Sequence, residues 1–158
     1  TRIPSSAASD VYKRQTATTT LKTSDNDSSG ITIAQTGTTD GSGNLLTTEA
    51  GSTSTFTVVL NAKPTADVTV SITGADSTEH SLSASALTFT DSNWNTAQTI
   101  TVTGVDDSLD DGDITTTLTA TASNSGGYAG SETATTTLKT SDNDTAGITI
   151  AQTGTGQW

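Results

Sequence analysis

The same twelve residues, TATTTLKTSDND, occur twice in this chain of 158 residues, at 16–27 and at 133–144. A second pair of identical segments, GITIAQTG, follows the two copies at 30–37 and 147–154. Each copy lies 117 positions after its counterpart, which is the length of an ordinary domain and too long for the units of common solenoids, about 20 to 50 residues. The sequence therefore predicts one complete repeat, 29–144, from a tandem array of domains.

The segments outside this repeat are assigned to its neighbours. Residues 16–28 are expected to hold the last strand and linker of the preceding repeat, and 145–158 the truncated first strand of the next repeat. Residues 1–15 differ in composition, because they contain three of the six basic residues of the chain. The stretch 5–15 resembles the in-frame translation of a transposase-type sequencing adapter, so we interpret 1–15 as a non-native, disordered scar.

The composition of the chain favours strands. It contains 39 threonines, and only 30% of its residues are hydrophobic and 4% aromatic, so the core is expected to be thin. Alternation of apolar and polar residues, the period of a half-buried strand, marks about seven segments. They are centred on Ile31 and Ile33; Phe56, Val58 and Leu60; Val68, Val70 and Ile72; Leu87 and Phe89; Ile100 and Val102; Ile114 to Ala120; and Ala134 to Leu138. Seven short strands separated by turn residues predict an all-β fold, an immunoglobulin-like antiparallel sandwich.

Charge and cysteine content limit the partners of the chain. Six basic and 17 acidic residues give a net charge of −11, a field that repels nucleic acid and anionic membranes and attracts cations. No stretch reaches the roughly 18 to 20 apolar residues of a membrane span. Cysteine is absent, so disulfides and thiolate metal sites are excluded.

The acidic residues are concentrated in two places. Five aspartates fall within eight positions, and two more flank an asparagine where one repeat becomes the next: Asp106, Asp107, Asp110, Asp111 and Asp113, then Asp142 and Asp144. Glu49 and Asp76 are expected to lie at the same end of the sandwich. Clustered carboxylates repel one another, and Ca²⁺, which takes six to eight oxygen ligands in loose geometry, is the expected cation. The alternative interpretation is that these aspartates only form turns and keep the protein soluble.

The repeat resembles a Calx-beta-type repeat, particularly the tandem forms in very large bacterial surface and secreted proteins. The resemblance covers about 29–144 and is carried by the order and spacing of these segments: Thr48 to Gly51, Phe56 to Leu60, Pro64 to Val70, Leu87 to Phe89, Asn93 to Asn95, Gln98 to Val102, Val105 to Asp113, and Asp142 to Asp144. It implies an immunoglobulin-like sandwich with calcium sites in the loops at one end.

The resemblance also implies which residues bind the ion. Glu49 matches the acidic residue that opens the domain, Asp76 a loop acid, and Asp107 and Asp111 the acids of the inter-strand loop. Asp142 and Asp144 match the closing acidic cluster. This sequence differs from strong calcium binders at Asn143, Gly112 and Ile114, where those proteins have carboxylates. Fewer charged ligands imply weak binding, in the range of about 10⁻⁴ to 10⁻³ M that is typical of extracellular modules.

These observations predict a non-enzymatic structural module: a spacer or stalk repeat of a bacterial cell-surface or secreted adhesin-like protein, stiffened by Ca²⁺ between repeats. Its expected partners are neighbouring repeats of the same chain and a cell-surface glycan or protein. One alternative is a ligand-binding module, which an exposed aromatic patch around Trp94 and Tyr128 would favour. Another is an accessory domain of a larger secreted hydrolase. Trp94 is expected to cover the core, and Tyr128 to anchor a loop.

Overall fold

The fold is described from a computed structural model, which places residues 19–154. The segment interpreted as a scar, 1–15, lies outside the described residues, as do 16–18 and 155–158. Residues 19–30 and 142–154 contain no strand, although both were expected to carry strands of neighbouring repeats.

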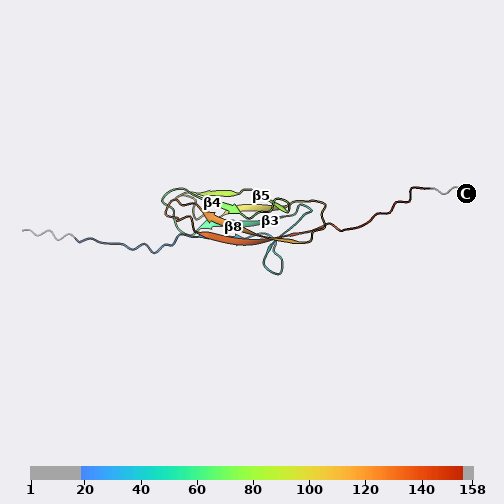
Figure 1. The fold of residues 1–158 in the computed structure, drawn as a ribbon. Helices are drawn as coiled ribbons and strands as arrows, with labels where there is room; N and C mark the ends of the chain where they lie inside the picture. The colour runs from blue at the N-terminus through green and yellow to red at the C-terminus, as the bar shows by residue number, and fades with distance from the viewer. Residues whose placement is uncertain (1–18, 155–158) are drawn as a thin grey trace, which may run out of the picture.

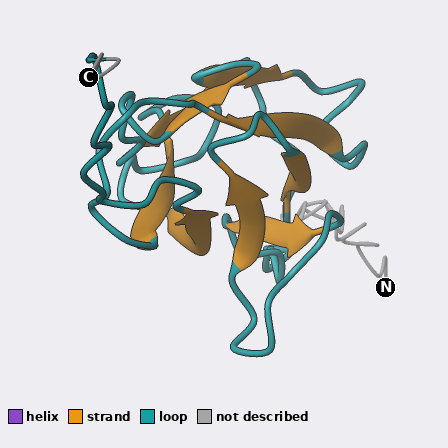
Figure 2. Ribbon diagram, turned by 90° about the vertical axis from the view of Figure 1, so that its right-hand side faces the viewer, coloured by secondary structure: helices purple, strands orange, loops and turns teal. Residues whose placement is uncertain are grey.

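The described residues form an all-β sandwich of immunoglobulin-like architecture, with strands connected by loops (Figure 2). One sheet has the order β1-β3-β7-β5 and the other β2-β9-β8-β4-β6. The strands are β1 (Ile31–Gln35), β2 (Leu45–Thr48), β3 (Thr53–Leu60), β4 (Val68–Thr73), β5 (His80–Leu82), β6 (Ala86–Phe89), β7 (Gln98–Gly104), β8 (Ile114–Ala122) and β9 (Thr133–Ser141). Residues 19–154 include no helix long and apolar enough to cross a membrane.

The seven predicted strands are all confirmed, and two further short strands, β2 and β5, are present. The pairing is antiparallel, as predicted, except at one place, where β2 pairs with β9 in parallel. This pairing arises because β1 and β2 are consecutive but join different sheets. β1 lies beside β3, and after the loop at 36–44 the chain continues in the same direction beside β9.

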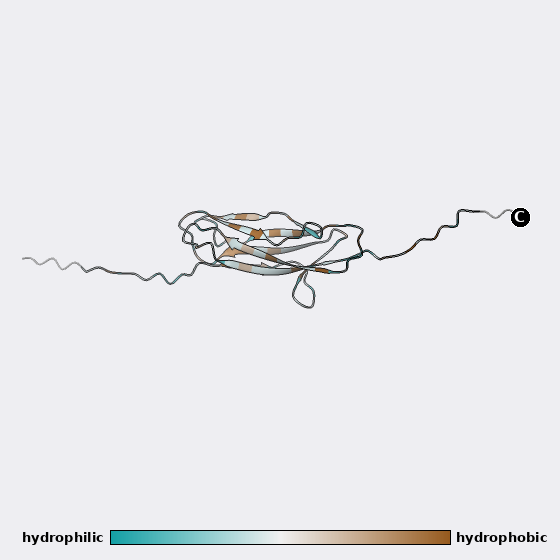
Figure 3. Cartoon of the chain, in the orientation of Figure 1, coloured by the Kyte–Doolittle hydropathy of each residue, from teal (hydrophilic) through white to brown (hydrophobic). Residues whose placement is uncertain are grey.

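The core lies between the two sheets. Its 17 buried hydrophobic residues all fall between Ile31 and Leu138. Leu118, Ala120 and Ala122 of β8 alternate with partly exposed threonines, and the other long strands repeat this pattern, so hydropathy changes in short bands along the strands (Figure 3). Among residues 19–154, every core residue belongs to the one repeat, so the sandwich closes its core without the described parts of the flanking segments.

The two ends of the sandwich are formed by different sets of loops. We call the end formed by loops 49–52, 74–79 and 105–113 and by residues 142–144 the acidic pole. The opposite pole consists of loops 61–67, 90–97 and 123–132. The described residues before β1 leave from the opposite pole, and those after β9 leave from the acidic pole (Figure 1).

Candidate functional site

The acidic pole contains ten of the sixteen carboxylates among the described residues. It is built where β2, β4, β7 and β9 end and where β3, β5 and β8 begin. The chain reaches this end four times, after β2, β4, β7 and β9, so loops far apart in sequence meet there.

Glu49 lies at the centre of the pole and is only 1% exposed. It directly follows β2, and its backbone N–H donates to the carbonyl of Ser141 at the end of β9 (3.1 Å). Its carboxylate accepts one hydrogen bond, from the backbone N–H of Asn143 at 3.4 Å. The parallel pairing of β2 with β9 thus places a buried carboxylate beside the segment that leaves the repeat.

Glu79 is the second buried glutamate, with 4% of its surface exposed. It directly precedes β5, and its backbone carbonyl accepts from the N–H of Val105 at 2.9 Å. Its Oε2 has no hydrogen-bond partner among the described residues. An oxygen of Glu79 lies within 4.8 Å of oxygens of Glu49 and Asp111. A buried carboxylate oxygen without a donor is unusual, because burial removes the water that would otherwise solvate it.

A second group of carboxylates shares Glu49. Oxygens of Glu49, Asp142 and Asp144 lie within 4.8 Å of one another. Asp142 accepts from the backbone N–H of Gly112 and from that of Asp144, each at 2.7 Å. Asp144 also has a buried oxygen, Oδ2, without a partner among the described residues. Glu49 therefore connects two sets of converging carboxylate oxygens.

The rest of the acidic loop holds the departing chain. Asp106 accepts from the side-chain amide of Asn143 at 3.0 Å, and Asp110 accepts from the backbone N–H of Ala146 at 2.7 Å. Asp107 accepts from the backbone N–H of Leu109 at 2.7 Å and so shapes the loop itself.

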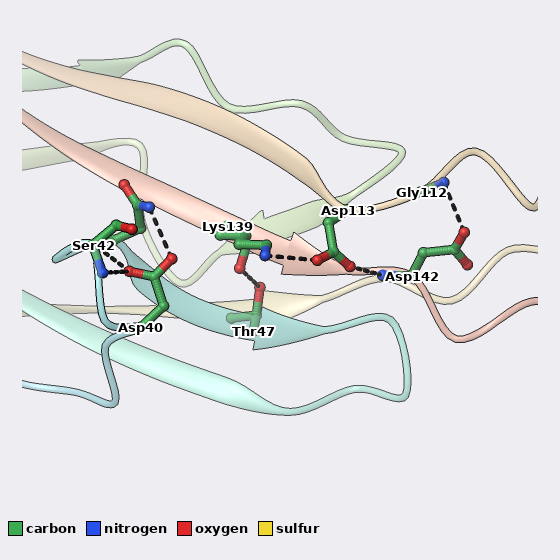
Figure 4. Close-up of polar contacts among 8 residues, drawn as sticks. Asp40, Ser42, Thr47, Gly112, Asp113, Lys139 and Asp142 are labelled. Carbon is green, nitrogen blue, oxygen red and sulfur yellow. Dashed lines mark hydrogen bonds and ion pairs between the residues drawn. The ribbon is translucent and has the colours of Figure 1, made fainter.

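One ion pair is found among the described residues, and it lies at the edge of the pole (Figure 4). The ammonium of Lys139 is 2.6 Å from Oδ2 of Asp113, whose Oδ1 accepts from the backbone N–H of Asp142 at 3.2 Å. Asp113 is therefore neutralised by Lys139. No such pair involves the carboxylates of Glu49 or Glu79 within residues 19–154.

The surroundings move the pKa values of these groups in two directions. Burial, reinforced by the negative charges of neighbouring aspartates, raises the pKa of Glu49, of Glu79 and of Asp144. Backbone N–H donors lower the pKa of Asp142, and Lys139 lowers that of Asp113. The three groups with raised pKa are those in which a buried carboxylate lacks sufficient donors or cations.

These donor sets fit a hard divalent cation. They consist of oxygens only, they are negatively charged, and two of the buried oxygens have no partner within residues 19–154. Ca²⁺ accepts such irregular sets of carboxylate and carbonyl oxygens, whereas Mg²⁺ requires a regular octahedron and the softer metals prefer nitrogen or sulfur.

The structure brings some of the predicted site residues together and separates others. Glu49, Asp111, Asp142 and Asp144 enter the two converging groups. Five others line the pole outside these groups: Asp76, Asp106, Asp107, Asp110 and Asp113.

Glu79 is the site residue that sequence reasoning missed. The sequence analysis selects Asp76, three residues earlier in the chain, and not Glu79. Asp76 is exposed, and its carboxylate accepts from the backbone and hydroxyl of Thr78 at 3.1 and 2.7 Å, so it forms the turn. The position of Glu79 immediately before a strand would have indicated its burial, but that strand, β5, has only three residues and could not be predicted.

His80 and the two aromatic residues singled out above are part of the fold. His80 is 1% exposed, and its Nε2 accepts from the backbone N–H of Asp76 at 3.3 Å. Trp94 is partly buried against the core, and Tyr128 is buried and hydrogen-bonded to Ala62. The predictions that Trp94 covers the core and that Tyr128 anchors a loop are confirmed.

Comparison with known proteins shows similarity of fold. No protein-family model matches the sequence, and no curated protein matches it. Similar solved structures include PapD-like domain 7 of human CEP192, at 12% identity over 84% of this chain and 97% of that chain, with a TM-score of 0.49. The apo-form Calx CBD1 domain matches at 15% identity over 73% of this chain and 99% of that chain, with a TM-score of 0.43. SSP-19, an MSP-domain protein like family member of Caenorhabditis elegans, matches at 12% identity over 64% of this chain and 94% of that chain, with a TM-score of 0.42.

Proposed function

We propose that this sandwich is a Calx-beta-like structural repeat that binds Ca²⁺ at its acidic pole and acts as a spacer in a tandem array. The observation that carries the proposal is the convergence of Glu49, Glu79 and Asp111, in which Oε2 of Glu79 is buried without a partner in the described part of the chain. Without a cation, these carboxylates repel one another in a site that water cannot fully solvate. A divalent cation would supply the missing partner.

The proposed role of the ion is mechanical. Asn143, Asp144 and Ala146, which lead out of the repeat, are hydrogen-bonded to Glu49, Asp142 and Asp110. An ion bound to Glu49, Asp142 and Asp144 would cross-link this exit to β2 and fix the direction in which the next repeat begins. Such a module suits a stalk of a bacterial cell-surface or secreted protein, where calcium is available.

The ligand-binding alternative receives less support. A glycan-binding surface typically offers exposed aromatic side chains, but Tyr128 is 3% exposed and Trp94 packs against the core. His80, the only histidine, is equally inaccessible. We therefore propose no catalytic activity for this repeat.

Thermal unfolding of the full chain in Ca²⁺, in Mg²⁺ and in chelator tests the proposal. Mass action predicts a stabilisation of about 2.7 kcal/mol when the ion is at a hundredfold its dissociation constant. We expect a rise in Tm with Ca²⁺ that Mg²⁺ does not reproduce.

Glu79→Gln makes the test specific to the site. It keeps the size of the side chain and removes the unpaired charge, so the variant should be at least as stable as the wild type in chelator while losing most of the calcium response. Asp67→Asn, at the opposite pole, is the matched control and should keep the full response. If Ca²⁺ raises Tm equally in Glu79→Gln and in the wild type, the ion does not bind where we propose.

A further inference from the structure

The junction between two repeats is present twice in this chain, each time with a different neighbour. Residues 24–30, SDNDSSG, precede the described sandwich, and residues 141–147, SDNDTAG, follow it. Five of the seven positions are identical, and the two segments occupy equivalent places in the repeat. The first copy shows how a junction is held by the repeat that follows it, and the second how it is held by the repeat that precedes it.

The following repeat holds the end of the junction. The hydroxyl of Ser29 donates to Oε1 of Glu132 at 2.6 Å. The carbonyl of Gly30 accepts from the backbone N–H of Asn61 at 2.9 Å, and the hydroxyl of Tyr128 lies 3.4 Å from it. Residues 29 and 30 are thus attached to the opposite pole of the sandwich that they enter.

The preceding repeat holds the beginning of the junction, and its contacts extend beyond residues 142–144. Besides the contacts of Asn143 and Asp144, the backbone N–H of Ala146 donates to Oδ2 of Asp110 at 2.7 Å. Ala146 is the equivalent of Ser29. The backbone of position 146 is thus held by Asp110 of the preceding repeat, and the side chain of its equivalent, Ser29, by Glu132 of the following repeat. In a tandem chain with both contacts, no free residue would remain between the two repeats.

The loops around this shared position complement each other. On the preceding side, a pocket is lined by Ser108 to Asp110 together with Asp144 to Gly147, and Leu109 at its edge is 63% exposed. On the following side, Lys63 lines a pocket with Gly126, Gly127 and Tyr128, and this pocket also contains Asp25 and Asp27, the counterparts of Asp142 and Asp144. Lys63 thus shares a hollow with the carboxylates that close the preceding repeat.

We propose that consecutive repeats form a closed joint, in which the loop tip at Ser108–Asp110 of one repeat packs against the loops of the next that contain Lys63 and Gly126–Tyr128. The partner is a second copy of this repeat. The inference rests on the proposed tandem array and adds to it a specific contact surface. Leu109 loses its exposure in this joint, and Lys63 offsets the negative charge of the acidic pole that faces it.

A tandem chain with a natural junction can be made from this sequence alone. Residues 147–154 are identical to 30–37, so residues 1–154 followed directly by 38–158 encode two complete repeats without any invented linker. The sequence has no cysteine, so Ser71→Cys in both repeats, an exposed position on β4, provides two sites for spin labels. The measurement is the distribution of distances between the labels, with Ca²⁺ and with chelator.

A closed joint should give one narrow distance peak in Ca²⁺. Leu109→Ser in the first repeat, or Lys63→Glu in the second, should abolish that narrow peak. The matched controls are Leu21→Ser and Lys22→Glu, two exposed residues of the same types that lie before the first sandwich, and they should leave the peak unchanged. The thermal midpoint of each variant confirms that both sandwiches remain folded.

A further variant strengthens the junction instead of weakening it. Ala146→Ser restores the hydroxyl that hydrogen-bonds to Glu132 in the first junction, where the residue is Ser29. This variant should narrow the distance peak further, whereas Thr145→Ser should not.

The outcomes separate this inference from the proposed function. A broad distribution in the tandem chain, together with a normal calcium-induced rise in Tm, overturns the joint and leaves calcium binding intact. A narrow peak that is unaffected by Leu109→Ser and Lys63→Glu also overturns the joint, because the rigidity then comes from elsewhere. A narrow peak lost in both variants supports the joint even if the calcium response is absent, in which case only the proposed function fails.

Discussion

The hydroxyl of Tyr128 lies against the backbone of Ala62, donating to its carbonyl at 2.9 Å and accepting from its N–H at 3.2 Å. This contact joins the loop after β8 to the loop after β3, 66 residues apart in sequence. Both loops form the opposite pole, where the chain enters the repeat. The tyrosine therefore holds together the surface on which the preceding repeat would rest.

Tyr128→Phe removes this contact and keeps the ring in the core. We expect a loss of about 1 to 3 kcal/mol in the free energy of unfolding, because two backbone groups of Ala62 lose their partner in a site with little access to water. Urea denaturation with an unchanged m-value would measure it. Thr65→Ala, an exposed side chain in the same loop, should change stability by less than about 0.5 kcal/mol. Equal stability of Tyr128→Phe and the wild type would show that the hydroxyl is dispensable.

The two copies of TATTTLKTS provide a test of how context controls the same residue. Leu138 in β9 is fully buried, and its counterpart Leu21 is 88% exposed. Leu138→Ala should cost about 2 to 5 kcal/mol because it leaves a cavity between the sheets. Leu21→Ala should change stability by less than about 0.5 kcal/mol. Comparable losses for both substitutions would mean that the first copy also packs into a core.

Acid should weaken the attachment of the junction to the opposite pole. Hydrogen bonds from the hydroxyl of Ser29 and the N–H of Ala129 lower the pKa of Glu132 from 4.5 to about 2. A carboxylate with a lowered pKa stabilises the fold above its unfolded pKa, and this contribution is lost as the pH falls from about 4.5 to about 2. The difference in Tm between the wild type and Glu132→Gln should therefore be constant above pH about 5 and disappear towards pH about 2.

Ser29→Ala is the companion variant for this pH dependence. It removes the strongest of the donors to Glu132 and reproduces the alanine that the second junction has at position 146. The acid-dependent loss of Tm should become smaller than in the wild type. If Ser29→Ala and the wild type have the same pH profile, the hydroxyl of Ser29 does not set the pKa of Glu132.

The positions of the long strands can be predicted from the local alternation of apolar and polar residues, but the carboxylate groups of the acidic pole cannot. Val68, Val70 and Ile72 of β4 alternate with partly or fully exposed polar residues, so their strand could be located from sequence. In β2, the inward positions include Thr47, and β5 has only three residues, so neither shows an apolar period. The sequence also could not show that β2 pairs with β9, a contact between segments more than 90 residues apart.

The same limit explains the partial prediction of the acidic pole. Aspartates that are neighbours in sequence, such as Asp110 and Asp111, were found because their clustering is visible in the chain. Loop geometry decides whether such an aspartate converges on Glu49 or binds a backbone N–H. Asp111 does the first, whereas the adjacent Asp110 binds the backbone N–H of Ala146. Glu79 was missed because its burial depends on pairing between β5 and β7.

Gly104 gives a last test, because it connects the packing of the sandwich to the proposed calcium site. A Cβ on this residue would meet the carbonyl oxygen of Thr48 and approach the backbone nitrogen of Glu49 to 3.4 Å. Gly104→Ala should therefore push the end of β2 outward and displace the Glu49 carboxylate. We expect both a lower Tm in chelator and a smaller rise of Tm with Ca²⁺.

Gly41→Ala, where a Cβ has open space, is the control. It should keep the full calcium response while gaining up to about 1 kcal/mol of stability from a less flexible unfolded chain. A Gly104→Ala variant that is destabilised but shows an undiminished calcium response would separate the position of Glu49 from ion binding and count against Glu49 as a ligand.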